Sequence, residues 1–166
     1  MLKKIIAAAG LLAFLAVPAQ AADGPTASFK SLTVEMAQKL ANATLTACRK
    51  ADFQVAVAVV DRSGVLQVLL RDRLAGPHTP AVAKGKAWTA LSFRTDTTEL
   101  SEATQAGKEA SGIRQVPGAI VVGGGVMVRA AGQLVGAVGV SGAPSGTADD
   151  ACARKGIEAV QDDLDF

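Results

Sequence analysis

Hydrophobic and polar residues follow two different periods along the chain, and these periods predict where helices and strands lie. Between residues 33 and 50, small apolar side chains recur every three or four positions, which is typical of a helix with one buried face. Thr33 precedes the pattern and is expected to cap that helix. Residues 55–61 and 65–71 are rich in Val and Leu, and the turn-forming residues between them predict a β-hairpin. The first of these strands is apolar on both faces, so we expect it at the centre of a covered sheet.

A second helix is expected after the loop at residues 75–78. Thr79 is placed as its N-cap and Pro80 as its first helical residue, because proline fits the first turn of a helix. The helix should run to about Phe93 and bury a stripe of small residues, with Lys86 at the edge of that stripe. A shorter helix is expected between residues 97 and 106.

The last third of the chain predicts three more strands and a terminal helix. The strands are expected at residues 119–122, 126–130 and 133–141, separated by glycine-rich turns. The helix should begin at Thr147, and Asp149 in its first turn complements the helix dipole. Because hairpin-like connections join most neighbouring strands, we predict an α+β fold in which helices pack on a largely antiparallel, five-stranded sheet.

The beginning of the chain has the pattern of an export signal. Lys3 and Lys4 precede an apolar stretch, and small residues at 19–21 match a cleavage site. We therefore predict a signal peptide at residues 1–21, a flexible leader at 22–31 and a single domain at 32–166. The apolar stretch is shorter than the roughly 20 residues of a spanning helix, so we expect no membrane span and a periplasmic or secreted location.

Charge argues against a nucleic-acid partner. The full chain has 17 basic and 15 acidic residues, and removal of the signal peptide takes away two lysines and no acid. A protein that binds the phosphate backbone usually carries a basic excess gathered on one face. The mature chain would be nearly neutral, so we expect no nucleic-acid binding.

The two cysteines lie in the part of the chain that is expected to be exported. Cys48 falls near the end of one predicted helix and Cys152 near the start of another. In an oxidising compartment we predict a disulfide between them, which would close a loop of roughly 100 residues. Two buried free thiols are the alternative, because sequence does not show whether the Cα atoms lie within bridging distance.

Several familiar chemistries do not fit the motifs. Gly123–Gly125 leads into a strand and lacks the pattern of a phosphate-binding loop. Ser141 stands in a segment that partly resembles a nucleophile elbow, but the second glycine is misplaced and the chain has a single histidine to act as a base. The segment after Ser141 runs into a helix N-terminus, which is either a rim for a carboxylate or phosphate or a purely structural turn.

Metal-binding residues are few. Glu99 and Glu102 form a Glu-x-x-Glu pair that either holds a hard cation weakly or is a solvated helix face. His78 lies just before a helix N-terminus, where the dipole favours the neutral imidazole that binds metals. The alternative for His78 is an exposed loop residue without a function.

Four motifs, taken in order, resemble the GlcG/HbpS family, which is also called the haem-degrading-domain family and is related to the C-terminal domain of PduO. The resemblance spans about residues 32–164, with Met127 standing where the family commonly has proline. It implies a profilin-like or PAS-like domain that assembles into dimers or octamers, with haem bound by some members. The motifs are residues 59–64, residues 86–90, Pro117-Gly118 with 123–126, and residues 136–143 followed by Asp149.

From the resemblance and the residues together we expect an exported haem-binding protein. His78 is the candidate iron ligand, and Lys86, Ser141 and Asp149 are the other candidate binding residues. The haem would be simply bound, sensed or degraded. The alternative hypothesis is an enzyme or accessory protein that acts on a small hydroxy or carboxylic acid in the same pocket.

Overall fold

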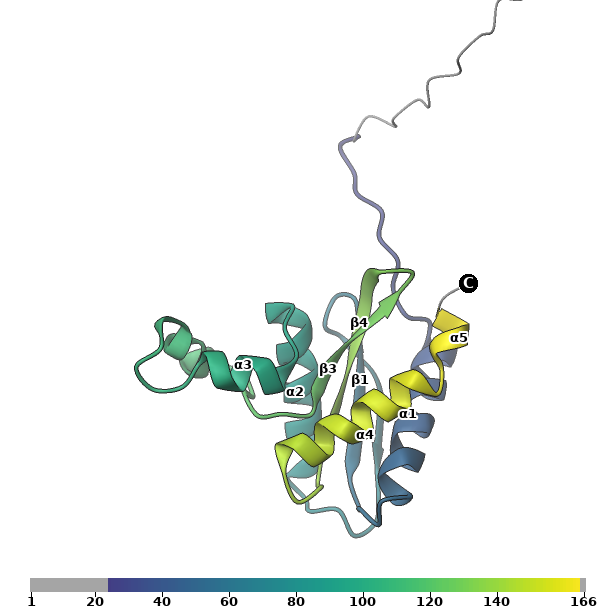
Figure 1. The fold of residues 1–166 in the computed structure, drawn as a ribbon. Coiled ribbons are helices and arrows are strands. Elements are labelled where there is room, and N and C mark those ends of the chain that lie inside the picture. The colour runs from purple at the N-terminus through teal and green to yellow at the C-terminus, as the bar shows by residue number, and fades with distance from the viewer. Residues whose placement is uncertain (1–23, 165–166) are drawn as a thin grey trace, which may run out of the picture.

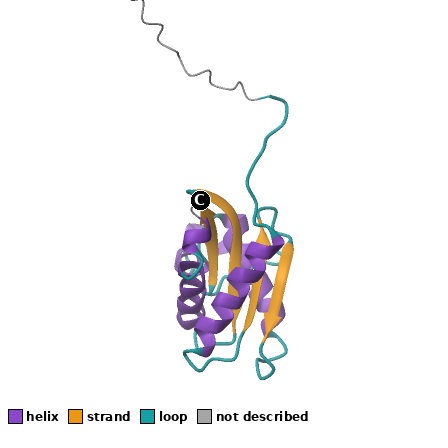
Figure 2. Ribbon diagram, turned by 90° about the vertical axis from the view of Figure 1, so that its right-hand side faces the viewer, coloured by secondary structure: helices purple, strands orange, loops and turns teal. Residues whose placement is uncertain are grey.

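The computed structural model describes residues 24–164, so the predicted signal peptide lies outside the described residues. Residues 24–31 extend away from the body of the domain (Figure 2). None of the helices in the described part is long and apolar enough to cross a bilayer. The elements in chain order are α1 (Val34–Arg49), β1 (Ala56–Asp61), β2 (Leu66–Arg71), α2 (Thr79–Phe93), α3 (Thr97–Ala103), the 3₁₀ helix η1 (Glu109–Gln115), β3 (Gly125–Ala130), β4 (Gln133–Ser141), α4 (Gly146–Glu158) and α5 (Gln161–Leu164).

The sheet is antiparallel throughout, with the strand order β2-β1-β4-β3. Helices α1 and α4 cover one face, and α2 covers the other (Figure 1). The predicted α+β class is therefore confirmed. The expectation that the first strand is central is confirmed as well, because β1 pairs with β2 on one side and β4 on the other.

The sheet has four strands in the described part of the chain, not five. Residues 119–122 form no strand and instead run along α2 after the arm that contains α3 and η1, which projects from the body (Figure 1). The Ile120 amide donates to the Thr89 hydroxyl at 2.8 Å. A Cβ on Gly85 would lie 2.4 Å from Cγ1 of Ile120. Residues 119–122 thus pack against α2 instead of pairing with a neighbouring strand. Their apolar sequence alone does not distinguish these two arrangements.

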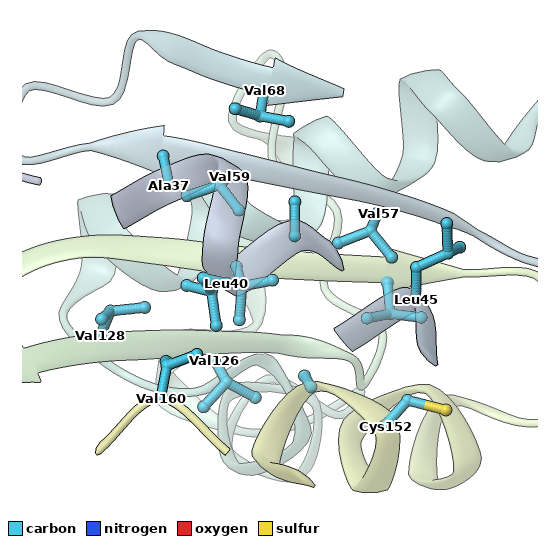
Figure 3. Packing of buried hydrophobic residues seen from close by; sticks show 14 of the residues in the cluster. Ala37, Leu40, Leu45, Val57, Val59, Val68, Val126, Val128, Cys152 and Val160 are labelled. Atoms are coloured by element: carbon cyan, nitrogen blue, oxygen red, sulfur yellow. The ribbon is translucent and has the colours of Figure 1, made fainter. Parts of the chain in front are cut away.

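Helix α1 begins as its sequence predicts. The Thr33 hydroxyl accepts a hydrogen bond from the Met36 amide at 3.2 Å, which satisfies one of the free amides of the first turn. Its buried side packs with valines of the sheet and with α4, in a cluster that includes Leu40, Val57 and Val126 (Figure 3). This cluster is the main hydrophobic core of the domain.

The cysteines join the two helices on this face of the sheet. Cys48 in α1 and Cys152 in α4 form a disulfide, and their Cα atoms are 5.2 Å apart. Both side chains are buried. The predicted disulfide is therefore present in the structure, and the alternative of two free thiols is not observed.

Helix α2 lies very close to the opposite face. A Cβ on Gly139 of β4 would lie 2.1 Å from the Ala83 carbonyl oxygen, so only glycine allows this approach. The side chains between α2 and the sheet are mostly alanines. Small residues therefore bring the backbone of α2 against β4, and this positions Lys86 and His78 for the site described below.

Two predicted helix ends differ from those observed. Helix α2 begins one residue earlier than expected: His78 occupies the N-cap position, and the Thr79 hydroxyl donates to the Gly76 carbonyl instead of capping. The terminal helix begins at Gly146 with Ser145 as its cap, and its last turn is a separate short helix, α5.

Candidate functional site

The four predicted binding residues line one cavity of about 330 Å³, where α2 and α4 begin near the end of β4. His78 and Lys86 come from α2 and its cap, Ser141 ends β4, and Asp149 lies in the first turn of α4. These residues are far apart in the sequence. Antiparallel pairing of β4 with β1 and the packing of α2 on β4 bring them together.

Lys86 and Asp149 form a buried ion pair at this cavity. The Lys86 ammonium donates to the Asp149 carboxylate at 2.7 Å and to the Val140 carbonyl at 3.0 Å. Both side chains are at most 4% exposed. The other oxygen of Asp149 accepts the Ala143 amide at 2.9 Å. The pair therefore ties α2, the end of β4 and the start of α4 to one another.

The environment of Asp149 opposes its ionisation on balance. Burial raises the pKa of this carboxyl above its ordinary value, because a charge loses its hydration there. The hydrogen bond and charge of Lys86 act in the opposite direction, as does the Ala143 amide, and they offset only part of the effect.

The glycine run 123–125 closes around this ion pair. Gly124 has φ +115°, which side chains rarely adopt, and a Cβ there would lie 2.6 Å from Cβ of Asp149 and 3.1 Å from Nζ of Lys86. The run is therefore needed for close approach to the pair. The sequence-based view that it makes a tight connection rather than a nucleotide site is consistent with this geometry.

His78 lies exposed at the rim of the cavity. Its imidazole makes no hydrogen bond or ion pair with any of residues 24–164. Ser141 is 5% exposed, and its hydroxyl likewise has no hydrogen-bond partner within the described chain. Both groups are therefore free to contact a ligand, whereas Lys86 and Asp149 already contact each other.

Sequence reasoning missed the loop residues that complete the cavity wall. Val122, Ala143 and Ser145 line it, and Val122 is 49% exposed. Val122 and Ser145 belong to no recognisable motif, and Ala143 ends the motif at residues 136–143 without a side chain that suggests binding. Their place at the cavity depends on how the loops after α3 and β4 fold back. Glu99 and Glu102 are exposed on α3 and are not among the residues that line the cavity. No cluster of three or more potential metal ligands occurs in the described part of the chain.

Known proteins resemble this chain in sequence and in structure. A corrinoid adenosyltransferase PduO of Citrobacter freundii is 32% identical over 114 residues, which is 68% of this chain and 34% of that protein. The chain thus spans about a third of the length of the PduO proteins that it matches. A 15.0 kDa protein of Citrobacter freundii with no assigned function is 31% identical over 68% of this chain and 80% of its own length.

Two solved structures share both fold and sequence with it. A double mutant of HbpS from Streptomyces reticuli has a TM-score of 0.77 and 39% identity, covering 87% of this chain and 97% of that chain. A PduOC complex with haem has a TM-score of 0.71 and 29% identity, covering 78% and 94%. The model of the family described as haem-degrading protein HbpS-like matches residues 32–158. The chain therefore belongs to the HbpS-like family.

Proposed function

We propose that this protein binds haem at the cavity between the starts of α2 and α4, with His78 as the iron ligand. The observation that carries the proposal is the position of the chain's single histidine at the cavity rim, with no partner for its ring in the described chain. Imidazole is a common axial ligand of haem iron. The haem complex of the PduOC relative, at 29% identity, supports the same ligand.

The donor set and the shape of the cavity fit such a group. A volume of about 330 Å³ lies at the small end of ligand pockets, so the cavity would take one edge of a porphyrin and leave the rest against the surface. Val122 offers apolar contact there, and the Ser141 hydroxyl offers a polar one. Bound haem would supply an iron centre with redox and ligand-binding chemistry, and the chain would orient it and limit access of water.

Lys86 and Asp149 serve this site by shaping it rather than by touching the haem. Their charges already meet at 2.7 Å, so Lys86 has no uncompensated charge to offer an acidic ligand. This differs from the sequence-based hypothesis in which Lys86 orients an acidic group. The same pairing weakens the alternative of an enzyme that would use Lys86 to hold a small acid.

We also propose that the domain acts outside the cytoplasm after removal of residues 1–21. The Cys48–Cys152 disulfide supports this, because such bonds persist in oxidising compartments. N-terminal sequencing of the protein recovered from the producing cells should begin near Ala22. An intact N-terminus on cytoplasmic protein would contradict export. Assembly into dimers or octamers stays a prediction, to be checked by native mass measurement.

Hemin titration tests the central proposal. The wild-type protein should shift the Soret band of hemin with saturation, and His78→Ala should lose the absorption bands of the imidazole-bound iron. The variant should fold normally, because the imidazole makes no hydrogen bond or ion pair with the described residues. Lys84→Ala, an exposed change on the same helix at a residue that does not line the cavity, is the control and should behave as wild type. The proposal fails if the wild type shows no shift or if His78→Ala gives identical spectra and affinity.

A further inference from the structure

The loop that carries His78 has a second, basic side. A separate cavity of about 370 Å³ lies at the end of β2, where the chain leaves the strand and turns toward α2. Three arginines and one acid contribute to its wall. The residues that line it are Arg49, Gln54, Arg71, Asp72, Arg73 and Leu74.

The acid in this wall is already paired. One oxygen of Asp72 accepts two hydrogen bonds from the Arg49 guanidinium, at 2.9 and 2.5 Å. Its other oxygen accepts the Val55 amide at 3.3 Å. The Asp72 side chain is 4% exposed. Asp72 therefore neutralises Arg49, and it forms no ion pair with either of the other two arginines in the described part of the chain.

Two positive charges remain without an acidic partner. Arg71 donates to the carbonyl of Ala75, a neutral acceptor. Arg73 is exposed, and its guanidinium has no hydrogen bond or ion pair with any described residue. Guanidinium groups match carboxylates in a planar, two-bond geometry that ammonium groups do not. The charge and geometry of this wall thus suit a ligand with one or two carboxylates.

The basic wall and the imidazole are held by the same short piece of backbone. Arg71 contacts the carbonyl of Ala75. The next residue, Gly76, lines the first cavity, and a Cβ on it would lie 2.8 Å from Cε1 of His78. Adjacent Cα atoms are about 3.8 Å apart, so the Arg71 guanidinium and the imidazole lie against neighbouring residues of this loop. Leu74, 73% exposed, offers an apolar contact on the same loop.

We propose that Arg71 and Arg73 form a carboxylate-binding site that receives the propionates of a haem whose iron is held by His78. The inference rests on the proposed haem binding and extends it. A porphyrin carries both propionates on one edge, several bonds away from the iron. A loop with an imidazole on one side and uncompensated guanidinium groups on the other reaches both parts of such a molecule. The site would fix the orientation of the ring about the iron–histidine bond.

The test compares hemin with hemin whose two propionates are esterified, titrated in one detergent-containing buffer. Wild type should bind hemin about tenfold more tightly than the diester, as expected for two partly exposed charge-assisted contacts. Arg71→Gln/Arg73→Gln should lose most of that preference while binding the diester as wild type does. Arg73→Lys should keep part of the preference, because the charge remains but the planar geometry is lost. Arg129→Gln, an arginine on the opposite edge strand β3, is the matched control and should keep the full preference.

The outcomes separate this inference from the proposed function. If wild type binds hemin through His78 and the double variant keeps the full preference for hemin, the propionate site is wrong and haem binding stands. If wild type binds no hemin, both fail. A free dicarboxylate such as succinate provides a further arm. Suppose that succinate stabilises wild type against heat but not the double variant, and that both bind hemin with the same affinity. The site would then be assigned to small acids, and the propionate proposal would be overturned.

Discussion

The two faces of the sheet are packed by different means. On the face covered by α1 and α4, valines and leucines fill the space and a disulfide joins the two helices. On the face covered by α2, alanines and glycines bring the helix backbone close to β4, and Lys86 of this helix forms a buried ion pair with Asp149 of α4 beside a cavity at the end of β4. The first arrangement excludes water from a large apolar core, and the second holds chain segments at fixed distances around an opening. The main apolar core and the proposed ligand site thus lie in different parts of the domain.

This contrast follows from the alternation of side chains along the central strand. In β1, Val57 and Val59 point to the α1 and α4 face, and Ala58 and Val60 point to α2. Large side chains on one face and small ones on the other set the distance of each helix from the sheet. Changes to the first face should therefore alter stability more than ligand binding, and changes to the second should alter both.

The largest effect is expected from removal of the disulfide on the apolar face. In Cys48→Ala/Cys152→Ala the denatured chain regains the freedom of a loop of about 100 residues, which costs about 4 to 5 kcal/mol of unfolding free energy on the chain-entropy model. Urea denaturation of the oxidised wild type and the variant measures it. Hemin affinity should stay near the wild-type value at temperatures where the variant is folded. A loss below about 1 kcal/mol, or a loss of hemin binding by the folded variant, would contradict the division between the faces.

Breaking the ion pair between α2 and α4 should come next. Asp149→Ala leaves the Lys86 ammonium buried without its partner, which typically costs about 3 to 5 kcal/mol. It also frees the Ala143 amide at the cavity wall, so hemin binding should weaken as well. Lys86→Met/Asp149→Leu replaces both charges with apolar groups and should recover much of the stability. If the double variant is no more stable than Asp149→Ala, the cost does not come from an unpaired charge.

A smaller, pH-dependent effect should distinguish Asp149 from its amide. Because the folded-state pKa of Asp149 is raised above the unfolded value, the native state holds this proton more tightly. The contribution of Asp149 to stability is therefore fully present below the unfolded pKa and falls as pH rises through the folded one. The unfolding free energies of wild type and Asp149→Asn should be measured across acidic pH. As pH rises, the unfolding free energy of wild type should fall relative to that of the variant, and at higher pH the difference should become constant. A trend in the opposite direction would mean that Lys86 outweighs burial.

The smallest effect is expected at an ion pair of similar length on the surface. Lys39 and Asp163 approach to 2.6 Å, but their side chains are 55% and 45% exposed. Asp163→Asn should change the unfolding free energy by less than about 1 kcal/mol, and less still in high salt. Compared with Asp149→Ala, it tests whether burial rather than distance decides the energetic role of a pair. A loss as large as that of Asp149→Ala would overturn this view.

The local sequence pattern was enough to predict most helices and strands. It was not enough to predict how the site residues interact. The Thr33 cap, the β1–β2 hairpin and the helical span of α2 follow from residues close in sequence. His78, Lys86, Ser141 and Asp149 were grouped from the motifs of the resemblance and from their places beside helix ends, and the structure brings all four to one cavity. The pairing of Lys86 with Asp149 was missed, because those residues are 63 positions apart and only the packing of α2 on β4 brings them together.

By itself the sequence determined the α+β class, the central place of the first strand and the presence of one histidine beside a helix start, because each depends on local periodicity and residue type. Only the tertiary structure decided that residues 119–122 run along α2 rather than join the sheet, and that Lys86 is neutralised while Arg71 and Arg73 are not. Such outcomes depend on which distant groups compete for the same hydrogen bonds and charges. These groups belong to segments that are far apart in the sequence and meet only in the folded protein, so a local pattern cannot predict which of them will pair.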